Sequence, residues 1–252
     1  MPRTYRDAAV VLRGHSFGEA DRVVVLLTQD HGKVRAVAKG VRKTTSKFGA
    51  RLEPGNHVEV QLHRGRDLDV VQQVALLATR TATRTHLESL TDALAMCEAV
   101  DRVCHDREPV PAIYRALVGA LRSLEQRRSE LVLGAFLFRL LALDGVGPTF
   151  DECASCGSEM NDAIAGFNVM RGGVECTDCH RGARLDAESG ELLRLILSGR
   201  IGEALAREAE TPATLAGACR RVSVLARTAM EHHVEKRLRA MSVFHRDDSM
   251  NR

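Results

Sequence analysis

The sequence predicts an α+β protein with an N-terminal five-stranded OB-fold barrel and a C-terminal α-helical domain that carries an inserted four-cysteine zinc module. Three observations predict this fold. Five short β-type segments fill the first 80 residues, the apolar period becomes helical from about Thr83, and two Cys-x-x-Cys pairs interrupt the helical part. The expected parts are residues 1–80 (barrel), 81–150 and 183–245 (helical domain), 151–182 (zinc module) and 246–252 (flexible tail).

Composition is that of an ordinary soluble protein. The chain has 252 residues and a formal net charge of +3. It shows neither the cleavage pattern of an export signal nor an apolar run of the ~18 residues that a membrane span needs, so we expect a cytoplasmic protein. The charge is uneven: residues 1–80 carry fourteen Lys and Arg against eight Asp and Glu, which is +6 and leaves −3 for the remainder. The N-terminal part therefore suits an anionic partner.

The first domain is predicted from strands and turn residues. The expected strands cover residues 8–12, 22–27, 34–38, 57–62 and 69–74. Turn residues such as His31-Gly32 and Pro54-Gly55-Asn56 separate them. The longer link at 40–53 falls where an OB-fold places its connecting segment. An SH3-like barrel is the alternative.

A basic segment overlaps the third strand and this link. Residues 33–51 contain seven cations and no acid: Lys33, Arg35, Lys39, Arg42, Lys43, Lys47 and Arg51. Such a segment can follow a phosphate backbone, and the alternative is a solvated charged face. Aromatic residues are few here, so binding would depend on backbone charge and carry little sequence information. Phe48 could stack on a base or fill the end of the barrel, and the sequence does not decide between them.

The helical domain is predicted from apolar spacing. A first helix would bury Leu87, Leu90, Leu94, Cys97 and Cys104, and a second runs over 113–124 after Pro109 and Pro111. The third, residues 129–145, is apolar nearly all round and should be the centre of the domain. Further helices are expected at 190–198, 201–206 and 212–241. Cys97, Cys104 and Cys219 lie at apolar positions and are interpreted as inert buried thiols.

The remaining four cysteines form two pairs, Cys153/Cys156 and Cys176/Cys179, with nineteen residues between the pairs. This is the spacing of a structural zinc ion bound by four thiolates, with a short hairpin between the pairs. Two disulfides or a redox pair are the alternatives, and neither suits a chain with seven cysteines and no export signal. His180 could replace a thiolate, but with four cysteines present we expect it to be an exposed neighbour.

Catalytic motifs are missing from the sequence. It has no Gly-x-x-x-x-Gly-Lys-Ser/Thr phosphate loop, no Gly-x-Ser-x-Gly elbow and no His-Glu-x-x-His pair. We therefore expect a binding protein and not an enzyme.

The order of these parts resembles the bacterial DNA repair family RecO. The resemblance rests on GEADRVVVLLT (18–28), HGKVRAVAKG (31–40), SKFG (46–49) and LEP (52–54) in the barrel, on FLFRLLALDG (136–145) with Pro148, and on the four cysteines. Some members of that family lack the cysteines.

The resemblance implies a recombination mediator that works at the nucleoid. Such a protein binds single- and double-stranded DNA and anneals complementary strands. It acts on DNA coated by single-strand binding protein, whose acidic and apolar C-terminal tail it contacts through the helical domain, and with RecR it helps to load RecA. Carried onto this chain, the DNA contacts fall on the seven cations of residues 33–51. A zinc-containing RNA- or ribosome-associated adaptor is the alternative function, and an assembly protein whose basic segment holds an acidic partner is a third.

Overall fold

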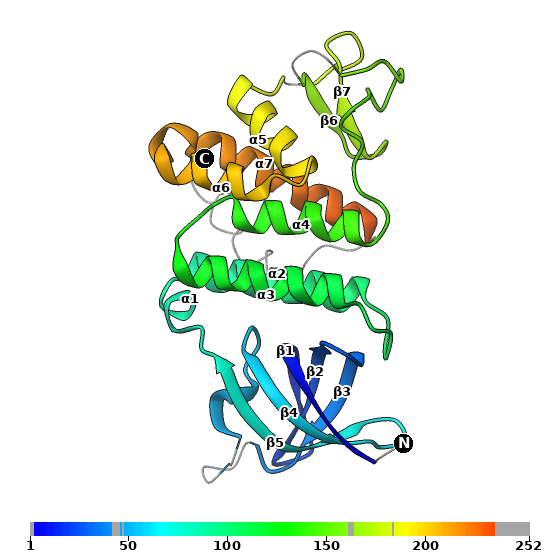
Figure 1. The fold of residues 1–252 in the computed structure, drawn as a ribbon, viewed down its shortest axis with the longest axis vertical. Coiled ribbons are helices and arrows are strands. Elements are labelled where there is room, and N and C mark those ends of the chain that lie inside the picture. The colour runs from blue at the N-terminus through cyan, green and yellow to red at the C-terminus, as the bar shows by residue number, and fades with distance from the viewer. Residues whose placement is uncertain (1–2, 42–45, 47, 161–163, 183, 235–252) are drawn as a thin grey trace. The chain divides into compact units, whose positions relative to one another are not determined.

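The computed structural model describes residues 3–41, 46, 48–160, 164–182 and 184–234. These residues form two compact units, which we call the barrel unit (3–126) and the helical unit (127–234). The predicted fold class is confirmed, with a closed five-stranded barrel at the N-terminus and helices with a small hairpin after it (Figure 1).

The barrel consists of β1 (Thr4–Phe17), β2 (Asp21–Thr28), β3 (Gly32–Ala38), β4 (His57–His63) and β5 (Asp69–Ala78). The strand order is β1-β2-β3-β5-β4, with β4 paired to β1 and a parallel contact between β3 and β5. This is the order of an OB-fold, so the first interpretation is confirmed over the SH3-like alternative. All five expected strands exist. β1 is much longer than predicted because it bends at an irregularity between Val11 and Arg13 and pairs with both β4 and β2.

The end of the link between β3 and β4 fills the barrel. A 3₁₀ turn, η1 (Gly49–Leu52), places Leu52 in the core, and Phe48 and Val41 belong to the same buried cluster. Phe48 is only 9% exposed. It is therefore a core residue and not a platform on which a base could stack.

The barrel unit also contains α1 (Thr81–Thr85), α2 (Leu87–Val103) and α3 (Pro111–Gln126), with α2 and α3 side by side over one end of the barrel (Figure 1). The Tyr114 hydroxyl lies 2.8 Å from His57 Nε2 of β4. The start of β3 touches the α2–α3 loop so closely that a Cβ on Gly32 would lie 2.0 Å from the carbonyl oxygen of Glu108.

The predicted face of α2 is partly wrong. Leu87 is 65% exposed and Leu94 is half-buried, whereas Met96, Cys97 and Val100 are fully buried. The reason is that α2 packs against both β1 and α3, so its buried stripe is turned away from the leucines. The face predicted for α3 is confirmed, with Leu117 and Leu121 fully buried.

The helical unit consists of α4 (Val132–Leu143), α5 (Ala187–Leu197), α6 (Ile201–Glu210), α7 (Pro212–His233) and the hairpin β6 (Gly166–Asn168) and β7 (Gly173–Glu175). α4 is buried along nearly its whole surface, as predicted. It approaches α7 at Gly134, where a Cβ would lie 2.8 Å from the Cα of Ser223. The expected continuation of α7 to residue 241 and the tail 246–252 lie outside the described residues. Among the helices of the described ranges, none is long and apolar enough to cross a membrane.

Candidate metal centre and nucleic-acid surface

Two tight turns bring the cysteine pairs together in the helical unit. In the first, the N–H of Gly157 donates to the carbonyl of Cys153 at 2.8 Å, and Gly157 has a φ of +73°, which favours glycine. In the second, the N–H of His180 donates to the carbonyl of Cys176 at 3.0 Å. The hairpin predicted between the pairs is confirmed, with Phe167 paired to Val174.

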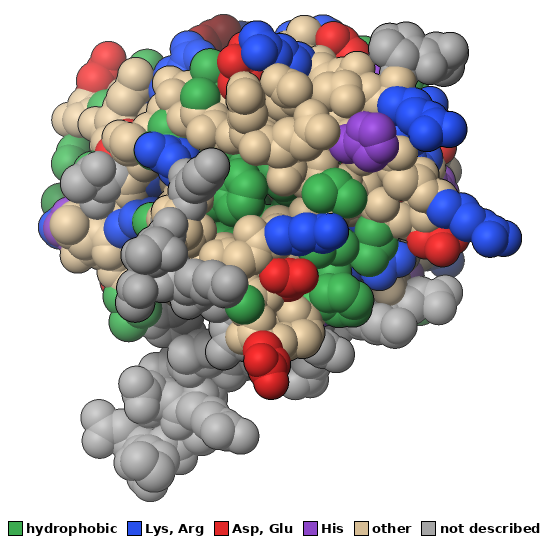
Figure 2. Space-filling view, turned by 90° about the horizontal axis from the view of Figure 1, so that it is seen from below, with side chains coloured by type: hydrophobic (Ala, Val, Ile, Leu, Met, Phe, Trp, Pro, Cys, Tyr) green, Lys and Arg blue, Asp and Glu red, His purple; other side chains and the backbone are tan. Residues whose placement is uncertain are grey.

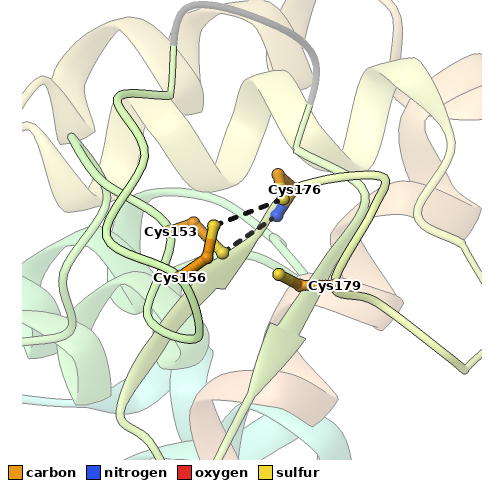
Figure 3. Close-up of side chains that lie close together, drawn as sticks. All are labelled: Cys153, Cys156, Cys176 and Cys179. Atoms are coloured by element: carbon orange, nitrogen blue, oxygen red, sulfur yellow. Dashed lines mark hydrogen bonds between the residues drawn. The ribbon is translucent and has the colours of Figure 1, made fainter.

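The four sulfur atoms converge on one point. Cys153, Cys156, Cys176 and Cys179 place their Sγ atoms within 4.8 Å of one another, and the Sγ atoms of Cys156 and Cys176 are 3.9 Å apart (Figure 3). Zinc bound tetrahedrally at ~2.3 Å from each sulfur needs sulfur atoms about 3.8 Å apart. The donor set and its spacing therefore fit a four-thiolate zinc ion, with no place left for a water ligand.

Backbone N–H groups favour the thiolate form of one of these four cysteines. Cys153 is 1% exposed, and burial by itself opposes its ionisation. Hydrogen bonds from the N–H groups of Cys176, Cys156 and Ser155 overcome this effect and lower the pKa of Cys153 to about 6. A thiolate is the form that binds zinc, so the backbone around Cys153 favours the ligand state.

The exposure expected for His180 is wrong, although the residue is not one of the four clustered ligand side chains. Its side chain is 12% exposed, and its Nδ1 lies 3.0 Å from Oε2 of Glu175. The ring packs on the backbone of Gly166, where a Cβ would lie 2.2 Å from it. His180 is thus a half-buried neighbour of the sulfur cluster. Sequence reasoning missed Glu175, because a single glutamate before a cysteine carries no recognisable signal.

The three other cysteines are buried, as predicted. Burial is the main cause that raises the pKa of Cys97 and of Cys219 to about 12. These thiols therefore stay protonated and unreactive at neutral pH.

The seven cations of residues 33–51 do not share one environment. Arg35 on β3, Lys39 after it and Arg51 on η1 are exposed. Lys33 is not: its side chain is 12% exposed and its Nζ donates to the carbonyl of Asp101 at 2.5 Å. The same ammonium lies 3.4 Å from the Asp101 carboxylate. Arg42, Lys43 and Lys47 lie outside the described residues.

Charge on the visible surface is dispersed. On the face shown in Figure 2, Lys and Arg side chains are spread around a central group of hydrophobic side chains, with acidic side chains between some of them. Some cations of the barrel unit are also paired, as in the contacts of Arg13 with Asp101 and of Arg22 with Glu53. Residues 39–47 carry four cations and no acid in the sequence.

Two sequence models of one protein family together cover nearly the whole chain. The model described as recombination protein O N terminal matches residues 1–80, and the one described as recombination protein O C terminal matches residues 84–242. The chain belongs to the recombination protein O (RecO) family. The RecO family supports a role in DNA repair and recombination, and the resemblance seen in the sequence is confirmed.

Replacing any one of the four clustered cysteines with serine is expected to reduce zinc binding. Because one of four ligands is lost, the loss in affinity should exceed the 10- to 100-fold typical of a changed outer hydrogen-bond partner. The measurement is zinc content per chain after gel filtration, followed by thermal unfolding with and without a chelator. Cys219→Ala is the control, since it removes a buried thiol of the same unit that does not belong to the sulfur cluster. A variant that keeps a full zinc ion would exclude its cysteine from the ligand set.

Proposed function

We propose that this RecO-family chain is a recombination mediator without catalytic activity. It binds single- and double-stranded DNA, anneals complementary strands, and with RecR helps to load RecA onto DNA coated by single-strand binding protein at the nucleoid. The match of both family models over nearly the whole chain carries the proposal. One zinc ion bound by Cys153, Cys156, Cys176 and Cys179 has a structural role in it.

Annealing without nucleotide hydrolysis is physically reasonable for such a surface. Two complementary strands repel one another as polyanions, and cations that neutralise phosphates lower this barrier. With Phe48 buried in the barrel, the basic segment provides no aromatic platform at that position. Weak contact with bases leaves their edges free to pair.

The proposed DNA contacts are Arg35, Lys39, Arg42, Lys43, Lys47 and Arg51. Arg35 and Lys39 support this choice best because both are exposed on or directly after β3. Lys33 is left out, since its ammonium already contacts Asp101 and lies 3.8 Å from the Asp106 carboxylate. To reach a phosphate, Lys33 would have to give up these contacts, and a hydrogen bond that involves a charged group contributes about 1.5–3 kcal/mol to stability.

Reversing the two exposed cations, as R35E/K39E, is expected to weaken DNA binding equally for unrelated sequences. On single strands, the slope of log binding constant against log salt concentration should become about 1.4 less steep, because each lost phosphate contact contributes about 0.7 to that slope. Fluorescence anisotropy at several salt concentrations measures both effects. R181E/R184E is the matched control because it makes the same charge change at two exposed positions of the helical unit.

Lys33→Gln provides a second control for that experiment. It should lower thermal stability without changing the salt slope, because Lys33 makes internal contacts. An unchanged slope in R35E/K39E, or an equal change in R181E/R184E, would remove Arg35 and Lys39 from the interface.

A groove in the helical unit is our candidate for the contact with the tail of single-strand binding protein. It has a volume of about 650 Å³ and lies among the end of α4, the β6–β7 hairpin and the end of α7. Its lining includes apolar side chains such as Leu141 and Phe167. Arg171 and His232 can carry positive charge there, and Glu231 is the one carboxylate among the described lining residues. An acidic and apolar peptide matches both features.

The function is tested by annealing of complementary strands coated with the cognate single-strand binding protein, at two salt concentrations and without nucleotide. The proposal expects acceleration that weakens at higher salt. Intact DNA binding without acceleration would contradict the mediator function. Tighter binding to structured RNA than to single-stranded DNA would favour the RNA- or ribosome-associated adaptor instead.

Met170→Glu tests the groove in the same assay. Met170 lines the groove and is 77% exposed, so the substitution should not disturb folding. Annealing of coated strands should slow by several-fold, because an interface residue contributes about 1–2 kcal/mol to the binding free energy. Annealing of uncoated strands should stay unchanged. Val224→Glu is the matched control, because Val224 is 53% exposed on α7 and does not line the groove. Equal effects of the two variants would exclude the groove as the binding site for the tail.

A further inference from the structure

A buried carboxylate lies behind the sulfur cluster. Glu175 is the last residue of β7 and is 6% exposed. Its Oε1 accepts hydrogen bonds from Ser155 Oγ at 2.5 Å and Asn168 Nδ2 at 2.9 Å, and its Oε2 lies 3.0 Å from His180 Nδ1. A buried carboxylate is costly unless such partners satisfy it.

The three partners come from three different parts of the module. Ser155 lies inside the first Cys-x-x-Cys turn, Asn168 ends β6, and His180 follows the second turn directly. Glu175 is also covalently next to Cys176, whose N–H donates to the sulfur of Cys153 at 3.4 Å. One side chain thus connects both cysteine turns with both strands of the hairpin.

The backbone supports the same assembly without using the sulfur atoms. The N–H of Ala154 donates to the carbonyl of Val174 at 2.8 Å, and the N–H of Ala165 donates to the carbonyl of Glu175 at 3.0 Å. The hairpin is further joined to the preceding segment by the N–H of Val174 and the carbonyl of Thr149, 3.0 Å apart. Phe167 packs its ring against Phe138 of α4 with centroids 5.7 Å apart. None of these contacts needs a metal ion.

We propose that Glu175 is the positioning residue of the metal centre, joining the two cysteine turns so that the thiols are assembled before the ion binds and the ion then leaves slowly. The inference rests on the proposed zinc site and deepens it. In many small zinc modules the ion is itself the source of folding energy, so that the metal-free chain is unfolded. Here the hydrogen bonds of Glu175 keep the hairpin folded without the ion.

Glu175→Gln is the primary variant, because it keeps the size of the side chain and removes its charge. Release of zinc to an excess of chelator should be faster by about 10- to 100-fold, if the release rate follows the loss of metal affinity typical of a changed outer hydrogen-bond partner. Asp178→Asn is the matched control: it removes one exposed carboxylate between Cys176 and Cys179. Its release rate should equal that of the wild type.

Two further measurements separate positioning from loss of folding. If Glu175→Gln fails to fold, Ser155→Ala replaces it in the release experiment. Ser155→Ala removes only one hydrogen bond of Glu175, at a half-buried position, and should speed zinc release by a few-fold. Hydrogen exchange of the metal-free full chain should show protected N–H groups at Ala154, Ala165 and Val174 in the wild type and lost protection in Glu175→Gln.

The outcomes are distinguishable. Equal release rates of Glu175→Gln and the wild type, or equal acceleration by Asp178→Asn, would overturn the positioning role while leaving the zinc site intact. Unprotected amides in the metal-free wild type would overturn the preassembled module. A wild-type chain that takes up no zinc would overturn the metal centre itself, and the positioning role with it.

Discussion

The parallel contact between β3 and β5 closes the barrel, and the buried carboxylate of Asp69 supports it. Only two residue pairs make this contact, Ala36 with Asp69 and Val37 with Val70. Asp69 is fully buried and accepts hydrogen bonds from Tyr5 of β1 at 2.5 Å, from the N–H of Gly65 at 3.1 Å and from Arg107 at 2.8 Å. Burial opposes ionisation, but the hydrogen bonds from Arg107, Tyr5 and Gly65 hold the pKa of Asp69 below its usual value. The closing contact is therefore fixed to β1, to the β4–β5 turn and to the α2–α3 loop at once.

This arrangement explains why the helices α1–α3 belong to the barrel unit. Arg107 lies in the α2–α3 loop with a φ of +62°, an unusual conformation for a residue other than glycine. Its N–H donates to the carbonyl of Lys33, so the loop holds the start of β3 while its guanidinium reaches Asp69. Glu175 is comparable in the helical unit, because its buried carboxylate also receives hydrogen bonds from donors in several segments. In both units a polar group coordinates loops that apolar packing alone would leave unspecified.

Sequence patterns identified the elements that depend on apolar spacing and missed those that depend on polar contacts. The five strands and α4 were predictable because burial repeats with the period of the element. The cysteine cluster was predictable because its chemistry needs a fixed spacing. The networks around Asp69 and Glu175 were not, since their partners lie up to 64 residues apart and follow no period. The exposed Leu87 shows the same limit, because the stripe that α2 buries is decided by the elements packed against it and not by its own leucines.

The basic segment shows how tertiary structure changes the meaning of a charge count. Lys33 and Arg35 are two residues apart on β3 and point to the same outer face of the barrel, yet only Arg35 faces solvent. The end of α2 covers the strand at Lys33 and supplies Asp101 as its partner. Among the described cations of this segment, Arg35, Lys39 and Arg51 are exposed, and the proposed phosphate contacts therefore begin at Arg35. The link after β3 is held at its start, where the N–H of Gly40 donates to Asp21 at 2.8 Å, and at its end, where Phe48 enters the core. A basic segment fixed at both ends to a barrel can meet a phosphate backbone without reading its bases, which is the property that annealing of arbitrary strands requires.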